Sequence, residues 1–182
     1  MTLYFHRIQK SSEDLEQIYD LYMKAFPEDE RVPWPFFIKR ASKNYVDFWT
    51  IRTEKEWVGF AYLIKDQALA YLFYLAVAPE LRGRGFGHKI IAALKEHYQD
   101  RTFFLAREML DPAAENYEER VKRHQFYLSC GLKDLPGHIK EYTVVYDIMG
   151  SGGPVEAKKY KKLMDRYAGP IGRWTVERRI LE

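Results

Sequence analysis

A glycine-rich turn with two arginines stands between a predicted strand, residues 70–77, and an amphipathic helical pattern. Backbone N–H groups at a helix N-terminus point outward, and the helix dipole places about half a positive charge there. Gly85 and Gly87 have no Cβ, so a phosphate can approach the backbone closely. Arg82 and Arg84 add guanidinium groups that suit phosphate oxygens. The segment therefore predicts an anion-binding cradle.

Two common phosphate-binding loops do not fit this segment. A Walker loop needs Gly-Lys-Ser/Thr, but Gly87 is followed by His88. A dinucleotide fingerprint needs G-x-G-x-x-G. Read from Gly83, that pattern requires a glycine where the chain has His88, and read from Gly85 it requires one where the chain has Ile90.

The spacing that does fit is Arg/Gln-x-x-Gly-x-Gly/Ala, supplied by Arg82, Gly85 and Gly87. This resembles the pyrophosphate-binding motif of the GNAT superfamily of acyl-CoA-dependent N-acetyltransferases. The resemblance implies acetyl-CoA as co-substrate. It assigns coenzyme A contacts to Arg82, Gly83, Arg84, Gly85, Phe86, Gly87 and His88. The alternative is an ordinary turn whose glycines serve only packing or a helix cap.

A second motif lies in RHQFYLSCGL, where Phe126, Tyr127 and Gly131 resemble the FY-x-x-x-Gly segment of the same family. The resemblance implies that Tyr127 lies near the sulfur of coenzyme A and is the general acid. A phenol is protonated at neutral pH and can protonate a departing thiolate. The alternative is a core aromatic residue with a satisfied hydroxyl, because the chain has 14 tyrosines.

The end of the strand before the turn is the third contact implied by the resemblance. In this family the strand bulges and splays from the next one, so backbone N–H groups become free. At Leu75, Ala76 and Val77 these groups would bind the pantetheine arm and the acyl carbonyl. An unpaired donor aimed at that carbonyl would stabilise the oxyanion. The side chains themselves are predicted to be core.

The reaction also requires a base on the acceptor side. An alkylamine with a pKa of about 10 is protonated at neutral pH, and removing that proton costs roughly 4 kcal/mol. Glu108 follows the predicted strand 102–106 and could accept the proton through water or bind the cationic amine. Pairing with Arg120 or Arg123 is an equal alternative, and Glu30 is the second candidate base. Many family members have an asparagine where this chain has Arg120, so no role is transferred there.

Further contacts are predicted for both substrates. Arg123 is a candidate for a phosphate of coenzyme A. The aromatic segment 33–37, with Trp34 and the neighbouring Glu30, and the last strand, with Tyr146, are expected to line the acceptor site. The five histidines and the single cysteine form no metal-ligand spacing, so no metal is expected.

The elements that must position these residues follow from hydrophobic periodicity. Strands are predicted at residues 3–8, 46–52, 57–64, 70–77, 102–106 and 141–149. A first helix is predicted from a cap at Ser11 or Ser12 to residue 26, and a second, short helix ends at residue 43. Three more helices are predicted directly after the glycine turn, at 118–130 and at 155–167. This order matches the α/β (α+β) GNAT fold, a mixed, twisted, mostly antiparallel sheet of six to seven strands with helices on both faces.

Composition and charge agree with one enzyme-sized domain. Of the 182 residues, 47% are hydrophobic, which suffices for a sizeable core. We expect a GNAT acetyltransferase domain at 1–149. Residues 150–182 are expected to form a basic, helical extension packed on it. Residues 151–182 hold eight Lys/Arg and four Asp/Glu, against 21 and 22 in the rest. A solvated helix face is the favoured explanation, and a nucleic-acid partner is not expected.

The location follows from cysteine usage and hydropathy. Cys130 is the single cysteine, so no internal disulfide can form, and this fits the cytoplasm. The sequence has neither a signal peptide pattern nor an apolar run of about 18 residues, so no membrane span is expected.

The sequence thus predicts an acyltransferase that moves an acetyl group from acetyl-CoA to a primary amine of a small molecule or peptide, by direct attack in a ternary complex. Two alternatives stay open. The chain could be a non-catalytic sensor that binds coenzyme A, or a GNAT domain acting on a nucleic-acid- or protein-bound partner through its basic tail. A homodimer is also left open.

Overall fold

The computed structural model describes residues 2–9, 11–141, 144–175 and 178–181. The strands are β1 (Tyr4–Arg7), β2 (Val46–Arg52), β3 (Trp57–Lys65), β4 (Leu69–Val77), β5 (Thr102–Glu108), β6 (Lys133–Glu141), β7 (Val144–Ser151) and β8 (Arg178–Leu181). The helices are α1 (Leu15–Ala25), α2 (Trp34–Ala41), α3 (Phe86–His97), α4 (Tyr117–Ser129) and α5 (Ala157–Thr175), with 3-10 turns η1 (Glu28–Glu30) and η2 (Pro79–Leu81).

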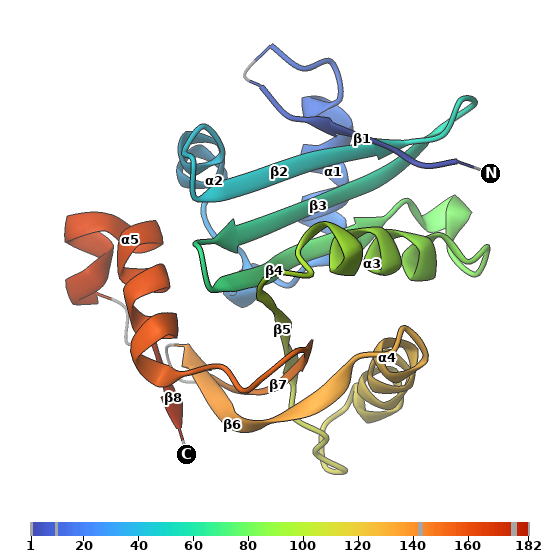
Figure 1. Ribbon diagram of the computed structural model, residues 1–182. Helices are drawn as coiled ribbons and strands as arrows, with labels where there is room; N and C mark the ends of the chain where they lie inside the picture. The colour runs from blue at the N-terminus through green and yellow to red at the C-terminus, as the bar shows by residue number, and fades with distance from the viewer. Residues whose placement is uncertain (1, 10, 142–143, 176–177, 182) are drawn as a thin grey trace. The chain divides into compact units, whose positions relative to one another are not determined.

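The strands are hydrogen-bonded in the order β1-β2-β3-β4-β5-β7-β6-β8 (Figure 1). The pair β4/β5 is parallel, whereas β1/β2, β2/β3, β5/β7, β6/β7 and β6/β8 are antiparallel. The predicted mixed, mostly antiparallel sheet is therefore confirmed, with eight strands in place of six to seven. None of the described helices is long and apolar enough to cross a membrane.

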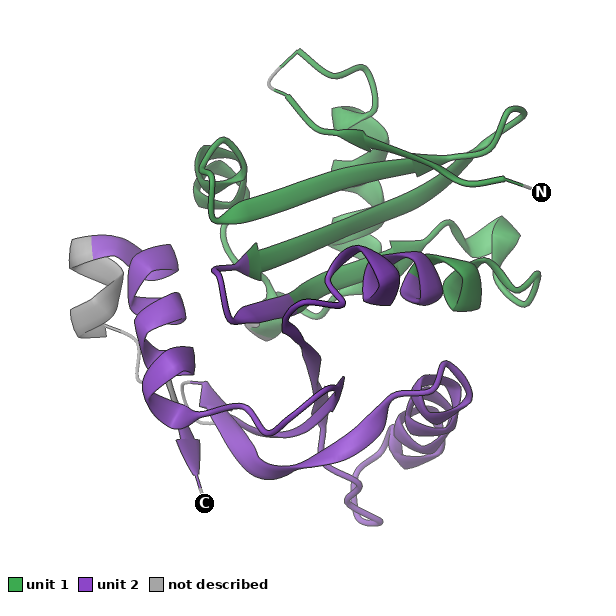
Figure 2. Cartoon of the chain, viewed as in Figure 1, with its two compact units in different colours: residues 1–64, 72–90 green, residues 65–71, 91–182 purple. Residues whose placement is uncertain are grey.

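The chain divides into two compact units (Figure 2). Unit 1 comprises residues 1–64 and 72–90, and unit 2 comprises residues 65–71 and 91–182. Both α5 and β8, which lie in the predicted basic extension, belong to unit 2. The predicted domain boundary at residue 149 does not coincide with this division and stays a prediction.

The core of unit 1 is an aromatic cluster between α1, α2 and the sheet. Phe37 of α2 stacks on Tyr62 of β3 with ring centroids 4.1 Å apart, and Tyr22 of α1 lies 4.9 Å from Phe37. The predicted serine cap of the first helix is wrong. Asp14 occupies the N-cap position without capping, because its carboxylate accepts hydrogen bonds from the side chains of Thr50 and Arg52 on β2.

The core of unit 2 lies on both faces of its strands. On one face, Tyr71 stacks on Phe104 at 4.7 Å, and Tyr160 of α5 lies 6.1 Å from Tyr71. On the other face, Tyr98, the residue directly after α3, stacks on Phe103 at 6.4 Å. Because side chains alternate along a strand, neighbouring residues of β5 contact different segments of the chain.

Two strands were not predicted from the sequence. Strand β6 contains Pro136 and Gly137, residue types that are disfavoured inside strands. Gly137 has φ 84°, and the register with β7 shifts between Leu135 and His138, so the strand continues through an irregularity. Strand β8 is short and pairs with β6. The predicted single strand 141–149 therefore becomes the end of β6 and most of β7, and residues 142–143 lie outside the described residues.

Candidate active site

The glycine turn before α3 has an open, left-handed backbone. Gly83 and Gly85 have φ values of 75° and 80°, and no atom lies within 4 Å of where their Cβ atoms would be. The Lys89 N–H donates to the Gly85 carbonyl at 3.3 Å, which is the first hydrogen bond of the helix. The N–H groups of Phe86 and Gly87 therefore have no partner within the helix. This arrangement of donors beside open space fits an anionic group such as a pyrophosphate.

The two arginines of the turn have different surroundings. Arg82 Nε donates to the Val77 carbonyl at 3.2 Å, which ties the turn to the end of β4, and its terminal nitrogens contact no described residue. Arg84 pairs with Glu56 at 3.2 Å and lies over the Phe86 ring at 5.4 Å. Arg82 thus keeps its charge for a ligand, whereas the charge of Arg84 is partly neutralised.

The end of β4 pairs with β3 on one edge, and its other edge pairs with no strand of unit 1. The Ala78 N–H donates to the Val58 carbonyl at 2.9 Å. A Cβ on Gly59 would lie 2.1 Å from the Ala76 carbonyl oxygen, so only glycine permits this approach. Because backbone groups alternate in direction, those of Leu75 and Val77 point away from β3, where unit 1 has no further strand.

Helix α4 presents a polar stripe that ends at Tyr127. Asn116, Arg120, Arg123 and Tyr127 follow one another at intervals of four, three and four residues, which places them on one helix face. The Tyr127 hydroxyl makes no hydrogen bond to a described residue. Burial raises the pKa of Tyr127 above its ordinary value of 10.0, nearby Arg123 lowers it, and Cys130 adds to the rise. The phenol is therefore protonated at neutral pH and can act as a donor.

Glu108, the last residue of β5, is held by this stripe. Its Oε1 accepts from Asn116 Nδ2 at 3.1 Å and pairs with Arg120 Nη2 at 3.0 Å, while Oε2 pairs with Arg123. The pairing that the sequence offered as an alternative is thus present with both arginines. Glu108 also stands directly opposite Tyr146 of β7. The contribution of Asn116 was missed, although its position four residues before Arg120 was the available signal.

The sequence model of the acetyltransferase (GNAT) family matches residues 15–131, which include the glycine turn, Glu108 and Tyr127. The chain belongs to this family. The predicted resemblance is therefore confirmed. A comparison with curated proteins finds no match.

Solved structures of GNAT proteins share the fold. A GNAT-family protein from Bacteroides thetaiotaomicron has a TM-score of 0.66 and 17% identity, covering 93% of this chain and 98% of its own. A chimera of the spermidine N-acetyltransferase SpeG from Vibrio cholerae and hSSAT has a TM-score of 0.63 and 16% identity, covering 92% of this chain and 99% of its own. An aminoglycoside 6'-N-acetyltransferase complexed with coenzyme A has a TM-score of 0.61 and 16% identity, covering 81% of this chain and 96% of its own. At these identities the likeness shows the fold alone.

A second polar cluster of this GNAT protein surrounds Arg107 in unit 2. Arg107 is nearly buried, and its Nη2 pairs with Asp147 at 2.9 Å and with Asp134 at 3.3 Å. His124 contacts Asp134 and His138 contacts Asp147, each at 3.0 Å. Burial alone would raise the pKa of Asp134, but hydrogen bonds from His124 and Arg107 lower it below its ordinary value of 3.8. The sequence missed this cluster because β6, which supplies Asp134 and His138, was not predicted.

The predicted acceptor residues lie in both units. In unit 1, the Glu30 carbonyl accepts from the Tyr74 hydroxyl at 2.7 Å. Trp34 is partly exposed, stacks on Phe37 at 5.3 Å and meets Tyr19 edge-on at 5.2 Å. In unit 2, Tyr146 lies opposite Glu108. Among the described residues, no group of three His, Cys, Asp or Glu side chains could hold a metal ion.

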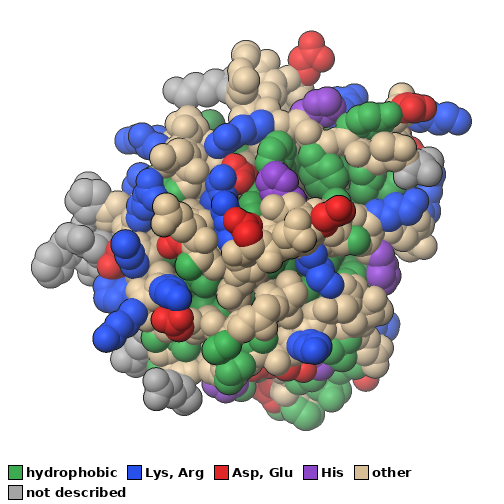
Figure 3. Space-filling view, in the orientation of Figure 1, with side chains coloured by type: hydrophobic (Ala, Val, Ile, Leu, Met, Phe, Trp, Pro, Cys, Tyr) green, Lys and Arg blue, Asp and Glu red, His purple; other side chains and the backbone are tan. Residues whose placement is uncertain are grey.

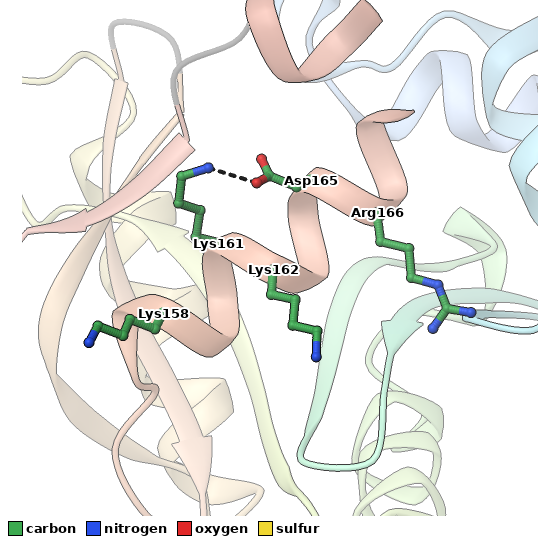
Figure 4. Close-up of a pocket in the computed structure, with 5 residues that line it drawn as sticks. All are labelled: Lys158, Lys161, Lys162, Asp165 and Arg166. Atoms are coloured by element: carbon green, nitrogen blue, oxygen red, sulfur yellow. Dashed lines mark hydrogen bonds and ion pairs between the residues drawn. The ribbon is translucent and has the colours of Figure 1, made fainter. Parts of the chain in front are cut away.

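A hollow of about 450 Å³ lies on the outer face of α5, lined by Lys158, Lys161, Lys162, Asp165 and Arg166 (Figure 4). Lys161 donates to Asp165 at 2.6 Å, and the other three side chains extend in different directions (Figure 4). Lys and Arg side chains gather over this helix in Figure 3. Basic groups that diverge from one another do not converge on a ligand, so this face carries no catalytic assignment.

Proposed function

We propose that this GNAT protein is an N-acetyltransferase that moves an acetyl group from acetyl-CoA to a primary amine of a small molecule or peptide. The observation that carries the proposal is the open glycine turn at the N-terminus of α3, where backbone donors face space that no Cβ fills. The family match over residues 15–131 supports the reaction class. The single cysteine supports a reducing compartment, the cytoplasm.

The turn binds the pyrophosphate of coenzyme A through its backbone. The N–H groups of Phe86 and Gly87 donate to phosphate oxygens, and Gly83 and Gly85 let the ligand approach. The terminal nitrogens of Arg82 add charge. Arg84, which Glu56 already neutralises in part, contributes less. Ala76 lies between Leu75 and Val77, whose outward N–H groups bind the pantetheine arm and the acyl carbonyl.

The chemistry is one acyl transfer. The neutral amine attacks the thioester carbon, and the outward N–H groups of Leu75 and Val77 stabilise the oxyanion. A carbon–nitrogen bond forms, the carbon–sulfur bond breaks, and the sulfur departs as a thiolate. Tyr127 gives its phenolic proton to that sulfur, which leaves a phenolate until a proton returns from solvent. The amine loses one proton to a base or to water.

The acceptor is a primary amine recognised by aromatic and acidic groups. Glu30 and Trp34 are the proposed contacts in unit 1, and Tyr146 is a separate candidate in unit 2, because an ammonium favours carboxylates and aromatic faces. Two structural neighbours, a spermidine N-acetyltransferase chimera and an aminoglycoside 6'-N-acetyltransferase, support an amine acceptor. Glu108 and Arg123 were also expected to contact the substrates. Their mutual ion pair gives them a different role, argued below.

A panel of amines with acetyl-CoA, read by release of the free thiol, tests the function. The expected result is thiol release above the rate of acetyl-CoA hydrolysis with at least one polyamine, amino sugar or peptide. Binding of acetyl-CoA without release by any amine would support the sensor alternative. If acetyl-CoA does not bind, both assignments fail.

A further inference from the structure

Arg120 and Arg123 share one carboxylate but differ in everything else that they contact. Arg120 also donates from Nε to Asn116 Oδ1 at 2.6 Å and from Nη1 to the Met109 carbonyl at 2.9 Å. Among the described residues, Arg123 has Glu108 as its single hydrogen-bonding partner. The guanidinium of Arg120 is therefore fixed on three sides, whereas most of the Arg123 guanidinium can face another group.

The Tyr127 phenol lies one helical turn beyond Arg123 on the same helix face. Arg123 precedes Tyr127 by four residues, so their Cβ atoms are about 5–6 Å apart on one helix face. Long side chains of a helix lean toward its N-terminus, which tilts the Tyr127 ring over the turn that holds Arg123. Arg120 is seven residues away, about 10 Å along the axis. Arg123 is also the cation that lowers the pKa of Tyr127 against the effect of burial.

We infer that Arg123 is a positioning residue for Tyr127, and that Glu108 acts through Arg123 rather than on the acceptor amine. This inference rests on the proposed role of Tyr127 as proton donor. When Tyr127 gives its proton to the thiolate, a phenolate is left on a partly buried side chain. A guanidinium, which is always charged, stabilises that phenolate. Glu108 holds the guanidinium in place and keeps it from pairing elsewhere.

The other ionisable groups near Tyr127 do not replace Arg123. His124, one turn before Tyr127, contacts both carboxylate oxygens of Asp134 at 3.0 Å. The Cys130 thiol is protonated at neutral pH because burial raises its pKa, and it raises rather than lowers the pKa of Tyr127. Lys95 donates to the carbonyls of Cys130 and Gly131. The charge that can stabilise a phenolate in unit 2 is therefore that of Arg123.

Titration of the Tyr127 phenol tests this inference without any substrate. Protein labelled with 3-fluorotyrosine gives fluorine NMR signals, and the Tyr127 signal is the one lost in Tyr127→Phe. Fluorine lowers the pKa of the phenol, which keeps its titration within the range where the fold persists. We expect Arg123→Gln to move the midpoint to higher pH. Arg123→Lys, which keeps the charge, restores most of the difference.

Arg120→Gln is the matched control, because it removes the other arginine of Glu108 at the same helix face. We expect it to leave the Tyr127 midpoint unchanged. Glu108→Gln should move the midpoint in the otherwise unaltered protein and have no further effect in the Arg123→Gln background, since neighbours in one network are not additive. In steady-state turnover, Arg123→Gln and Glu108→Gln should each lower kcat by less than Tyr127→Phe does. Neither should change the KM of the amine.

Three results would overturn the inference. The first is an unchanged midpoint in Arg123→Gln. The second is an equal midpoint shift in Arg120→Gln, which would indicate a general loss of structure around Glu108. The third is weaker acetyl-CoA binding by Arg123→Gln without a midpoint shift, which would return Arg123 to the phosphate contact predicted from the sequence. The midpoint needs no acetyl-CoA, so failure of the proposed function leaves this test intact.

Discussion

The glycine turn of unit 1 and the α4 stripe of unit 2 differ in the groups that they offer, backbone N–H groups in the turn and side chains in the stripe. The turn offers backbone N–H groups beside space that no side chain fills. The stripe offers charged side chains, and Glu108 is engaged by two arginines and an asparagine, which leaves one positive charge in excess. The Tyr127 phenol at the end of the stripe makes no hydrogen bond to a described residue, and we propose it as the proton donor.

The difference shows which functional claims a sequence motif can carry. A backbone site depends on residue types that set local geometry, so glycines at the right spacing are nearly sufficient. A side-chain site depends on partners from distant segments. Glu108 was predicted to act on the amine, and its ion pairs with Arg120 and Arg123 lead us to propose that it is a counter-ion. Substitutions in the two regions should therefore have effects of different kinds.

The largest effect is expected from the stripe. Tyr127→Phe removes one oxygen and little volume, and loss of general acid catalysis should lower turnover by about 10²- to 10⁴-fold while acetyl-CoA binding persists. Steady-state kinetics with a working amine and calorimetry measure the two quantities. Tyr160→Phe is the control, since that hydroxyl donates to Glu141 at 2.8 Å and serves packing. An unchanged rate in Tyr127→Phe would remove Tyr127 from the mechanism.

A smaller effect on stability should distinguish the backbone region. Gly59→Ala places a Cβ 2.1 Å from the Ala76 carbonyl oxygen, so β3 and β4 must shift. Overpacking of this kind costs about 1–3 kcal/mol, measurable by urea unfolding. Gly153→Ala is the control, because its Cβ would meet no atom within 4 Å and should change stability by less than about 0.5 kcal/mol. Equal stability of both variants would show that β4 is not held by this close approach.

The smallest effect is expected at the Arg107 cluster and depends on pH. The folded-state pKa of Asp134 is lowered by His124 and Arg107, so its contribution to stability is complete above its ordinary pKa of 3.8 and disappears as pH falls through the lower, folded value. Asp134→Asn should lower the Tm at neutral pH, and the difference from the unaltered protein should close in acid. A difference in Tm that is constant with pH would contradict this account.

Much of the fold was predictable because local patterns and tertiary structure agree. The boundaries of β2 and α4 follow the sequence prediction within a residue, and the left-handed Gly83 and Gly85 match the motif. Strand β6 was not predictable, since Pro136 and Gly137 are ordinary loop signals and only pairing with β7 and β8 makes the segment a strand.

The candidate site divides in the same way. The turn and Tyr127 follow from motifs of adjacent residues. The sequence offered Arg120 and Arg123 as partners of Glu108, but the role of Asp134 required knowing which strands meet, since residues 107 and 134 are far apart in sequence. Propensity rules have no access to such pairs, because tertiary contacts override local preference.

Calorimetric titration with acetyl-CoA tests the central claim, that the glycine turn binds the acyl donor. Binding is expected for the unaltered protein, with about 2.7 kcal/mol of added stability at 100 times the Kd. Gly85→Ala and Gly85→Glu share the strain of a side chain at φ 80°, so their difference isolates the added bulk and negative charge. We expect Gly85→Ala to bind more weakly than the unaltered protein and Gly85→Glu not to bind. Absence of binding by the unaltered protein, or equal binding by Gly85→Glu, would contradict the account.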